Sequence, residues 1–160
     1  MTFPVPQHDH GACIRSALDV AESECRRQGA KLTETRRRVL ELVWKSHQPV
    51  GAYALLELLT KEGWSAGPPT VYRALEFLVR TGLVHRIALL NAFVGCSRPG
   101  QVHAGAFLLC SQCGAAAELD DESISHAIVE AAGRLGFSVG RQTIEVEGLC
   151  PSCREKEGVS

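Results

Sequence analysis

The stretch Gly67–Gly82 reads GPPTVYRALEFLVRTG and decides the fold of the first half of the chain. Proline suits the first turn of a helix, where its missing N–H leaves no hydrogen bond unmade, and Gly82 suits the helix exit. Arg73 and Arg80 lie roughly opposite an apolar stripe with i, i+3, i+4, i+7 spacing, which predicts an amphipathic helix with one face in the core. That stripe consists of Val71, Ala74, Leu75 and Leu78.

The segments on either side of this helix complete a recognisable unit. Three amphipathic patterns precede it, at about residues 14–27, 33–45 and 53–61. A β-rich stretch, Leu83 to Val94, follows it and is interrupted at Leu90-Asn91, as in a two-stranded hairpin. An α-helix fits the major groove of DNA, and arginine can bond both phosphate and guanine edges. The order therefore predicts a winged helix-turn-helix.

The second half carries two Cys-x-x-Cys pairs, Cys110-Ser-Gln-Cys113 and Cys150-Pro-Ser-Cys153. Two such pairs supply the four thiolates of a closed tetrahedral zinc site. Around them the pattern predicts strands at 107–110 and 115–119, a helix from the acidic run at 120–122 to Gly136, and a strand at 138–146. A redox Cys-x-x-Cys usually opens a helix after a strand, whereas Gly114 leads into another strand. Structural zinc is therefore favoured, with a thiol oxidoreductase as the alternative.

Composition limits the class of protein. The 160 residues are 45% hydrophobic, and 17 basic residues nearly balance 18 acidic ones, which excludes a bulk basic protein coating nucleic acid. The excess of basic over acidic residues is concentrated between Arg26 and Lys45. These basic side chains either contact phosphate or form a solvent-exposed helix face. No run approaches the roughly 18 apolar residues of a membrane span, and no secretory signal pattern is present. We expect a cytoplasmic protein, in which seven cysteines favour metal ligation over disulfides.

A second, mixed set of ligand-type residues is spread over the junction of the two halves: His85, Cys96, His103 and Glu118. Imidazole, thiolate and carboxylate are all competent zinc ligands, and such a set would bind only when both halves come together. The alternative is that each is an ordinary surface or small buried residue. The remaining histidines and cysteines of the N-terminal half favour solvation or helix packing, without an assigned role: His8, His10, Cys13, Cys25 and His47. No nucleophile elbow, phosphate loop or His-Glu-x-x-His motif occurs, so we expect neither an enzyme nor a small-molecule substrate.

With these residues laid out, the sequence resembles the ferric uptake regulator (Fur) family over about residues 14–154, and most closely its zinc uptake regulator branch. The motifs that carry the resemblance are Leu32-Thr33-x-x-Arg36, Pro69-Thr70-Val71-Tyr72-Arg73-Ala74-Leu75-x-Phe77-Leu78, Gly82-Leu83-Val84-His85, Phe107-x-x-Cys110-x-x-Cys113-Gly114 and Gly148-Leu149-Cys150-x-x-Cys153. The histidine-rich run of iron-sensing relatives is reduced here to Val102-His103-Ala104-Gly105, which favours zinc. An iron- or peroxide-sensing regulator of the same family is the alternative.

The resemblance implies a metal-dependent repressor that binds palindromic operator DNA as a homodimer and represses zinc-uptake genes. It implies two zinc ions per subunit, one structural and one regulatory. The structural ion is assigned to Cys110, Cys113, Cys150 and Cys153, and the regulatory ion to His85, Cys96, His103 and Glu118. The DNA contacts implied are Tyr53 and Arg73, with Tyr72 and Arg36 as supports.

The expected fold is therefore α+β, with an N-terminal winged helix-turn-helix followed by a C-terminal α/β dimerisation domain that holds a zinc site made of four cysteines. We expect a flexible N-terminus at 1–12, the winged-helix domain at 13–97 with a hinge at about 85–104, and the dimerisation and metal-binding domain at 104–160.

Overall fold

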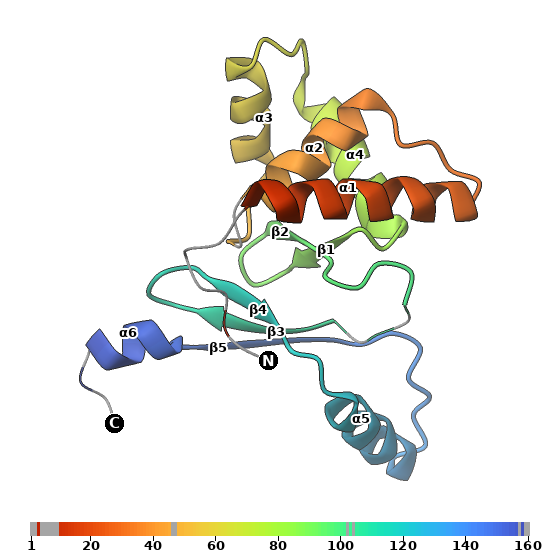
Figure 1. The fold of residues 1–160 in the computed structure, drawn as a ribbon. Coiled ribbons are helices and arrows are strands. Elements are labelled where there is room, and N and C mark those ends of the chain that lie inside the picture. Colours follow the sequence, from red (N-terminus) through yellow and green to blue (C-terminus); the bar gives the residue numbers. More distant parts are fainter. Residues whose placement is uncertain are drawn as a thin grey trace. The chain divides into compact units, whose positions relative to one another are not determined.

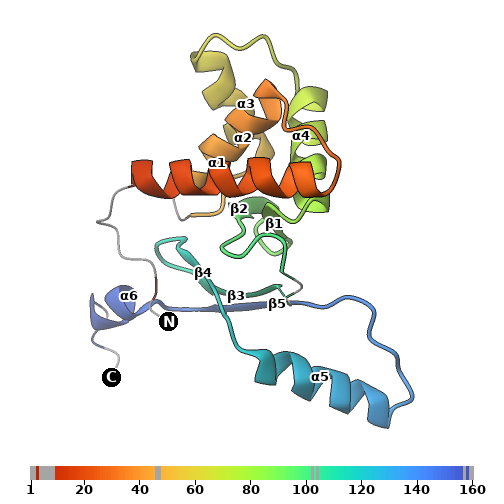
Figure 2. The same cartoon turned by 45° about the vertical axis from the view of Figure 1, so that its right-hand side comes forward.

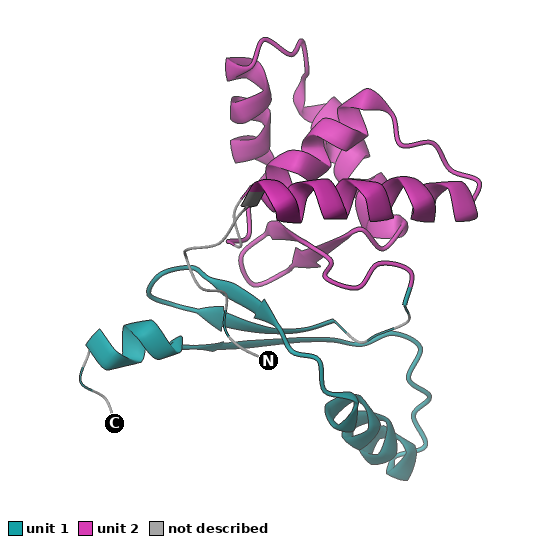
Figure 3. Ribbon diagram, in the orientation of Figure 1, with its two compact units in different colours: residues 1–4, 101–160 teal, residues 5–100 magenta. Residues whose placement is uncertain are grey.

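The computed structural model describes residues 3, 10–45, 48–101, 103, 105–156 and 158 (Figure 1). The chain separates into two compact units (Figure 3). Residues 5–100 form one, which we name the N-terminal unit, and residues 101–160 together with 1–4 form the other, the C-terminal unit. His8 and His47 lie outside the described residues.

The N-terminal unit consists of helices followed by a hairpin, as the sequence predicted. Its elements are α1 (His10–Arg27), α2 (Glu34–Trp44), α3 (Ala52–Lys61), α4 (Pro68–Arg80), β1 (Val84–Ile87) and β2 (Ala92–Gly95). The strands pair antiparallel, with His85 opposite Val94. Helix α1 begins four residues before the predicted start, so residues 10–12 of the expected flexible N-terminus belong to a helix.

Local signals in the sequence explain where these elements begin and end. Thr33 caps α2, because its Oγ1 accepts a hydrogen bond from the Arg36 N–H at 3.4 Å. Gly82, at a φ of +75°, follows the end of α4 in the left-handed conformation that glycine adopts without steric penalty. Asn91 has a φ of +46° at the hairpin turn, a conformation that asparagine tolerates better than most residues.

The core of the N-terminal unit lies between its helices and the hairpin. The predicted apolar stripe of α4 is buried, and Phe77 is buried beside it. Leu40, Leu55 and Leu59 from α2 and α3 join the same cluster. Gly95 lies directly under the Trp44 indole, because a Cβ there would come within 2.3 Å of Trp44 Cε2. This contact attaches β2, and with it the residue that follows, to α2.

The C-terminal unit is a three-stranded sheet with two helices (Figure 2). Its elements are β3 (Gly105–Cys110), β4 (Ala116–Glu118), α5 (Glu122–Arg134), β5 (Thr143–Gly148) and α6 (Pro151–Lys156). The strand order is β4-β3-β5, with β4 antiparallel and β5 parallel to β3. A parallel neighbour requires a crossover, which the segment containing α5 provides.

Two local predictions for this unit were inaccurate. The strand expected at 138–146 lies at Thr143–Gly148, because the polar and glycine residues before it do not join the sheet. Helix α6 was not predicted, although Pro151 at its first position is a known helix-start signal.

Helix α5 forms, but its apolar stripe does not enter a core. No residue of α5 is buried in the described structure, and Figures 1 and 2 both show the helix standing away from the sheet. Ile128 is 37% exposed and Val129 50%, and Leu135 beyond the helix end is 87% exposed. The periodicity therefore predicted the helix correctly, but no described part of the chain buries its apolar residues. Among the described residues, no helix combines the length and apolar character needed to cross a membrane.

Candidate metal centre and nucleic-acid interface

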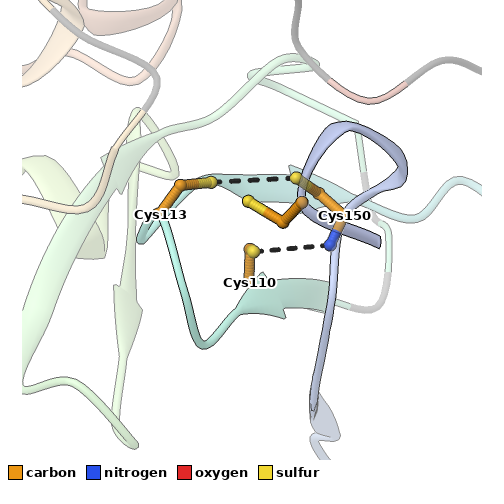
Figure 4. Close-up of side chains that lie close together, drawn as sticks. Cys110, Cys113 and Cys150 are labelled. Carbon is orange, nitrogen blue, oxygen red and sulfur yellow. Dashed lines mark hydrogen bonds between the residues drawn. The ribbon is translucent and has the colours of Figure 1, made fainter. Parts of the chain in front are cut away.

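The four cysteines of the two Cys-x-x-Cys pairs converge at one end of the C-terminal sheet. Figure 4 labels three of them, Cys110, Cys113 and Cys150. Cys110 ends β3, and Cys113 follows it across a tight turn in which the Gly114 N–H donates to the Cys110 carbonyl at 3.0 Å. Cys150 follows β5, and Cys153 lies in α6. Because β3 and β5 are parallel neighbours, their carboxyl ends bring the two pairs together.

The spacing of the sulfurs fits a tetrahedral metal ion. All four Sγ atoms lie within 4.8 Å of one another, and the Cys113 and Cys150 sulfurs are 3.8 Å apart. Four thiolates around one zinc at about 2.3 Å are themselves separated by about 3.8 Å. The Cys150 N–H donates to the Cys110 sulfur at 3.3 Å, the kind of outer-shell hydrogen bond that orients a thiolate ligand. The donor set present thus fits zinc.

The cysteine pKa values show how the cluster shares negative charge. Burial acts to raise the pKa of Cys110, but hydrogen bonds from the backbone N–H groups of Cys113, Cys150 and Gln112 outweigh it and lower that pKa to about 6. Burial and the neighbouring thiols raise the pKa of Cys153 to about 12. The Cys110 sulfur thus ionises easily, and its proximity disfavours ionisation of Cys113 and Cys153, whose pKa values are raised. A divalent cation removes this conflict, since it allows all four to be thiolates.

The surroundings of the cluster favour metal binding over dithiol redox chemistry. Cys110, Cys150 and Cys153 are each about 5% exposed or less, and Phe3 and Ala115 pack against them. The second pair does open a helix, as redox pairs do, but its sulfurs face those of the first pair. Sequence patterns gave no sign of the Phe3 contact, because the contact joins residues more than a hundred positions apart.

Two residues of the second set of possible zinc ligands, His85 and Cys96, lie close together in the N-terminal unit. His85 lies on β1 and Cys96 follows β2, and their ligand atoms lie within 4.8 Å of each other. The Cys96 N–H donates to the Leu83 carbonyl at 3.0 Å, which continues the ladder of the hairpin by one residue. Cys96 is 1% exposed, and His85 is half-buried. The hairpin therefore holds one nitrogen and one sulfur donor side by side.

The other two residues meet within the C-terminal unit. His103 Nε2 lies 2.7 Å from Oε1 of Glu118 on β4, and both side chains are nearly buried. His103 Nδ1 lies 2.8 Å from the Gln101 carbonyl oxygen. A carbonyl only accepts, so Nδ1 donates to it, and Nε2 is the ring nitrogen that faces the carboxylate. A ring oriented in this way by a hydrogen bond from its other nitrogen is typical of metal-ligating histidine.

The helix-turn-helix presents two aromatic residues and an arginine to solvent. Tyr53, at the start of α3, is 70% exposed, and Tyr72, in the first turns of α4, is 41% exposed. Their rings meet edge to face with centroids 6.5 Å apart. Arg73 is exposed beside Tyr72, and among the described residues it has no ion-pair partner. Exposed aromatic rings and a cation on the adjacent helices α3 and α4 suit contact with DNA.

Arg36, by contrast, is occupied within the fold. Its guanidinium lies 3.6 Å from the centroid of the Phe77 ring and donates to the Lys31 carbonyl at 2.6 Å. Arg36 thus braces α2 against α4.

The basic excess between Arg26 and Lys45 is largely neutralised. Four of its members are in ion pairs with Glu22, Glu24, Glu41 or Glu62: Arg27, Arg37, Arg38 and Lys45. The Arg38 guanidinium holds the pKa of Glu62 below its usual value. This arrangement favours the second interpretation of the basic cluster, a solvated and salt-bridged helix face, over a phosphate-binding patch.

Comparisons with known proteins agree with this architecture. Residues 27–147 match the model of the ferric uptake regulator family. The zinc uptake regulation protein of Escherichia coli K12 is 38% identical over 141 residues, which cover 88% of this chain and 82% of that protein. A solved zinc uptake regulator, complexed with zinc and DNA, superposes with a TM-score of 0.85 at 36% identity, covering 91% of this chain and 97% of the other. The holo form of a second regulator, XcZur, gives a TM-score of 0.80 at 40% identity, covering 88% and 98%. The chain therefore belongs to the ferric uptake regulator family.

Proposed function

We propose that this protein is a zinc-responsive transcriptional repressor that binds operator DNA as a homodimer and silences zinc-uptake genes when zinc is plentiful. The observation that carries the proposal is the coexistence of two donor sets of different character. One is a closed cluster of four cysteines, and the other consists of two pairs, one from each unit, neither of which makes a full ligand shell by itself. The similarity to a zinc uptake regulator solved in complex with zinc and DNA supports it.

The four-cysteine cluster is proposed as the structural zinc site. Its ligands come from both ends of the C-terminal unit's sequence, so one ion there would fasten that unit as a whole. Structural zinc in small sites contributes on the order of 10 kcal/mol to folding, as much as a whole small domain. We therefore expect this ion to be present under all conditions in which the protein is folded.

The two pairs, His85 with Cys96 and His103 with Glu118, are proposed as the regulatory site. Each pair alone offers two donors, whereas a protein zinc site commonly uses three or four. The N-terminal unit supplies one pair and the C-terminal unit the other, so a complete ligand set requires a particular arrangement of the two units. Zinc bound by all four residues would supply the positive charge that these donors need in order to lie together.

Coupling to DNA then follows from a shift in population. A homodimer carries two winged helices, and only some of their orientations match two half-sites separated by a turn of DNA. To change the ratio of DNA-competent to incompetent dimers from 1:99 to 99:1, a ligand must stabilise the competent state by about 5.5 kcal/mol relative to the other. Several metal–ligand bonds can provide that difference. We propose that Tyr53 and Arg73 contact the operator, that Tyr72 orients Tyr53, and that Arg36 supports α4, the helix that carries Arg73, through Phe77.

The exposed apolar residues of the C-terminal unit support homodimerisation. Helix α5 has 13 residues and buries none of them, although isolated helices of that length are marginal in water. Val146 on β5 and Phe137 after α5 are 49% and 66% exposed. In the described part of the chain β5 is also an edge strand, and an uncovered edge invites pairing with another strand. A second copy of the chain would cover both features.

Two alternatives make different predictions. An iron-sensing member of the family would have the same fold, but its operator binding would respond to iron rather than zinc. The thiol–imidazole pair of the hairpin favours zinc, since thiolate is a soft ligand. A thiol oxidoreductase would purify with little metal and titrate as a reversible dithiol. We propose a regulator without catalytic activity, acting in the cytoplasm.

The decisive experiment selects duplexes from a random pool with the zinc-loaded protein and then measures binding of the selected operator by fluorescence anisotropy. The protein is first treated with a chelator mild enough to leave the structural ion in place, as checked by metal analysis. Zinc, iron(II) and manganese(II) are then added back separately. Zinc is expected to restore tight binding at the lowest free concentration. Equal operator affinity before and after addition of each metal would contradict the proposal.

A further inference from the structure

An ion pair joins the middle of α2 to the end of α3. Arg38 Nε donates to Oε2 of Glu62 at 2.7 Å, and Arg38 Nη2 donates to Oε1 at 2.5 Å. These two parallel bonds form the fork that makes an arginine–carboxylate pair both strong and directional. The side chains are 29% and 28% exposed, and the residues lie 24 positions apart in the sequence. Most exposed ion pairs contribute little to stability, but a bidentate pair within a network is an exception.

Neighbouring charges hold this pair in place and balance it. Arg38 also donates to Glu41, one turn further along α2, and Lys45 Nζ lies 4.0 Å from Oε1 of Glu62. Two positive and two negative side chains thus form a network without net charge. Because such a network has no excess positive charge to attract a phosphate, we expect any effect on DNA binding to come from the structure that it holds.

Glu62 attaches the pair to a rigid part of α3. It caps the C-terminal end of that helix, where the helix dipole disfavours a carboxylate, so helix formation alone does not account for an acidic residue there. The Gly63 N–H donates to the Thr60 carbonyl at 3.0 Å. The Trp64 N–H donates to the Leu59 carbonyl at 3.0 Å, which completes a Schellman motif, and Trp64 packs against the core. Since this end of α3 is fixed, a displacement of Glu62 moves the helix instead of fraying its last turn.

The opposite end of α3 carries Tyr53, one of the proposed DNA contacts. The helix has 10 residues and spans about 15 Å, with Leu55 and Leu59 buried on one face. These leucines lie one turn apart, so their packing sets the depth of α3 but constrains its tilt less. The bonds to Glu62 add a second attachment at the end far from Tyr53. Residues that bind a partner must be held within about 0.5 Å of their bound geometry, so the tilt of α3 matters for the Tyr53 ring.

We propose that Arg38 and Glu62 are positioning residues for operator binding, which hold α3 at the tilt relative to α2 that presents Tyr53 to DNA. This inference rests on the proposed function and assigns a role to two residues that do not themselves contact DNA. Operator affinity falls in proportion to the fraction of subunits in which α3 is correctly placed. Loss of an ion pair of this kind is expected to lower that fraction about threefold. A homodimer uses two such subunits, so the two factors multiply to a loss of about ninefold in affinity.

The test replaces each residue by glutamine, which is neutral and cannot form the charged fork. Operator binding at saturating zinc is measured over a range of salt concentrations for the full-length wild type, Arg38→Gln, Glu62→Gln and the double variant, with the selected operator. The control variants are Arg37→Gln and Glu22→Gln, which break an exposed ion pair between α2 and α1. Melting temperatures are recorded for all of them, and binding is measured well below the lowest one.

The direction of the shifts separates positioning from a charge effect. Arg38→Gln and Glu62→Gln are each expected to weaken operator binding about ninefold, and the double variant to match them, because each change breaks the same bonds. The salt dependence should stay as in wild type, since no phosphate contact is lost. The control variants should shift less and in opposite directions, because Arg37→Gln removes positive charge and Glu22→Gln removes negative charge near an anionic partner.

The positioning role would be overturned, while DNA binding by the wild type stands, by tighter binding of Glu62→Gln or by unchanged affinity in both single variants whatever their melting temperatures. A salt slope reduced by about one in Arg38→Gln would overturn it too, because Arg38 would then be a phosphate contact. If the zinc-loaded wild type selects no operator, the proposed function fails and this inference with it.

Discussion

Replacing Cys153 by serine tests how far the C-terminal unit depends on its cysteine cluster. Among the described residues of that unit, few large side chains are buried: Phe107 is 2% and Leu109 4% exposed, and the other buried residues are alanines, a glycine and the cysteines themselves. Burial of two such side chains stabilises by about 1.5–3 kcal/mol each. A four-thiolate zinc site contributes about 10–16 kcal/mol, so the metal outweighs the local apolar core.

We expect Cys153→Ser to lower the free energy of unfolding of the C-terminal unit by more than about 4 kcal/mol, the range reached when a metal site is lost. The N-terminal unit should be unaffected, because Leu40, Leu55 and Leu75 form a core that includes none of the four cluster cysteines. Cys13→Ser is the control, since Cys13 lies on α1 in the N-terminal unit and undergoes the same chemical change.

The measurement is amide hydrogen exchange read by mass spectrometry, with zinc content determined on the same samples. Peptides from β3 and β5 should lose protection in Cys153→Ser, and peptides from α2 and α4 should keep it. Chelation of the wild type by a strong chelator should reproduce the pattern. Protection of β3 and β5 equal to wild type in the zinc-free variant would refute the reasoning, because the sheet would then be stable without the ion.

Four further predictions address the other parts of the molecule. Cys96→Ser should remain a folded dimer whose operator affinity no longer rises with zinc; an undiminished zinc response in anisotropy titrations would remove Cys96 from the regulatory set. Arg73→Ala should weaken specific operator binding by about 1–3 kcal/mol at matched salt, whereas Arg134→Ala, on α5, should not; equal affinities would exclude Arg73 as a contact. Ile128→Glu should shift the sedimentation equilibrium toward monomer, while the similarly exposed Val20→Glu on α1 should not, and a stable Ile128→Glu dimer would place the interface elsewhere. The pKa of Glu24 falls from 4.5 to about 2 on folding, so its contribution to stability is present above pH 4.5 and is lost as the pH falls toward 2. Glu24→Gln should reduce the loss of stability that the N-terminal unit shows as the pH falls from 4.5 toward 2. The same loss of melting temperature over this pH range in wild type and variant would disprove this expectation.

Several elements followed directly from local patterns. The stripe in α4, the proline at its start and Gly82 at its end gave a helix whose bounds and buried face agree with the structure. The Cys-x-x-Cys pairs indicated a four-sulfur cluster, and the sulfurs converge as expected. Such signals are reliable because they act over a few residues, through helix periodicity, backbone sterics and ligand geometry. The start of β5 and the short helix α6 were less well predicted, since sheet register and short helices depend on neighbours.

The roles of charged residues could not be obtained in the same way. The sequence placed arginines between Arg26 and Lys45 without showing which were available to DNA. The fold pairs Arg37 and Arg38 with glutamates from other segments and stacks Arg36 on Phe77, whereas Arg73 is exposed to solvent. These arginine contacts form when segments that are distant in the sequence pack together, so a local sequence pattern does not predict them.

The sequence by itself thus determined the helix-turn-helix, the hairpin and the chemistry of the four-cysteine cluster, because each depends on residues within one or two turns of chain or on fixed ligand spacing. Only the tertiary structure decided that His103 presents Nε2 to Glu118, that Glu24 lies close to Gly100, and that the apolar residues of α5 are left exposed among the described residues. These features arise where separate segments meet, and the free energy of such contacts depends on distances and burial that a linear pattern does not contain.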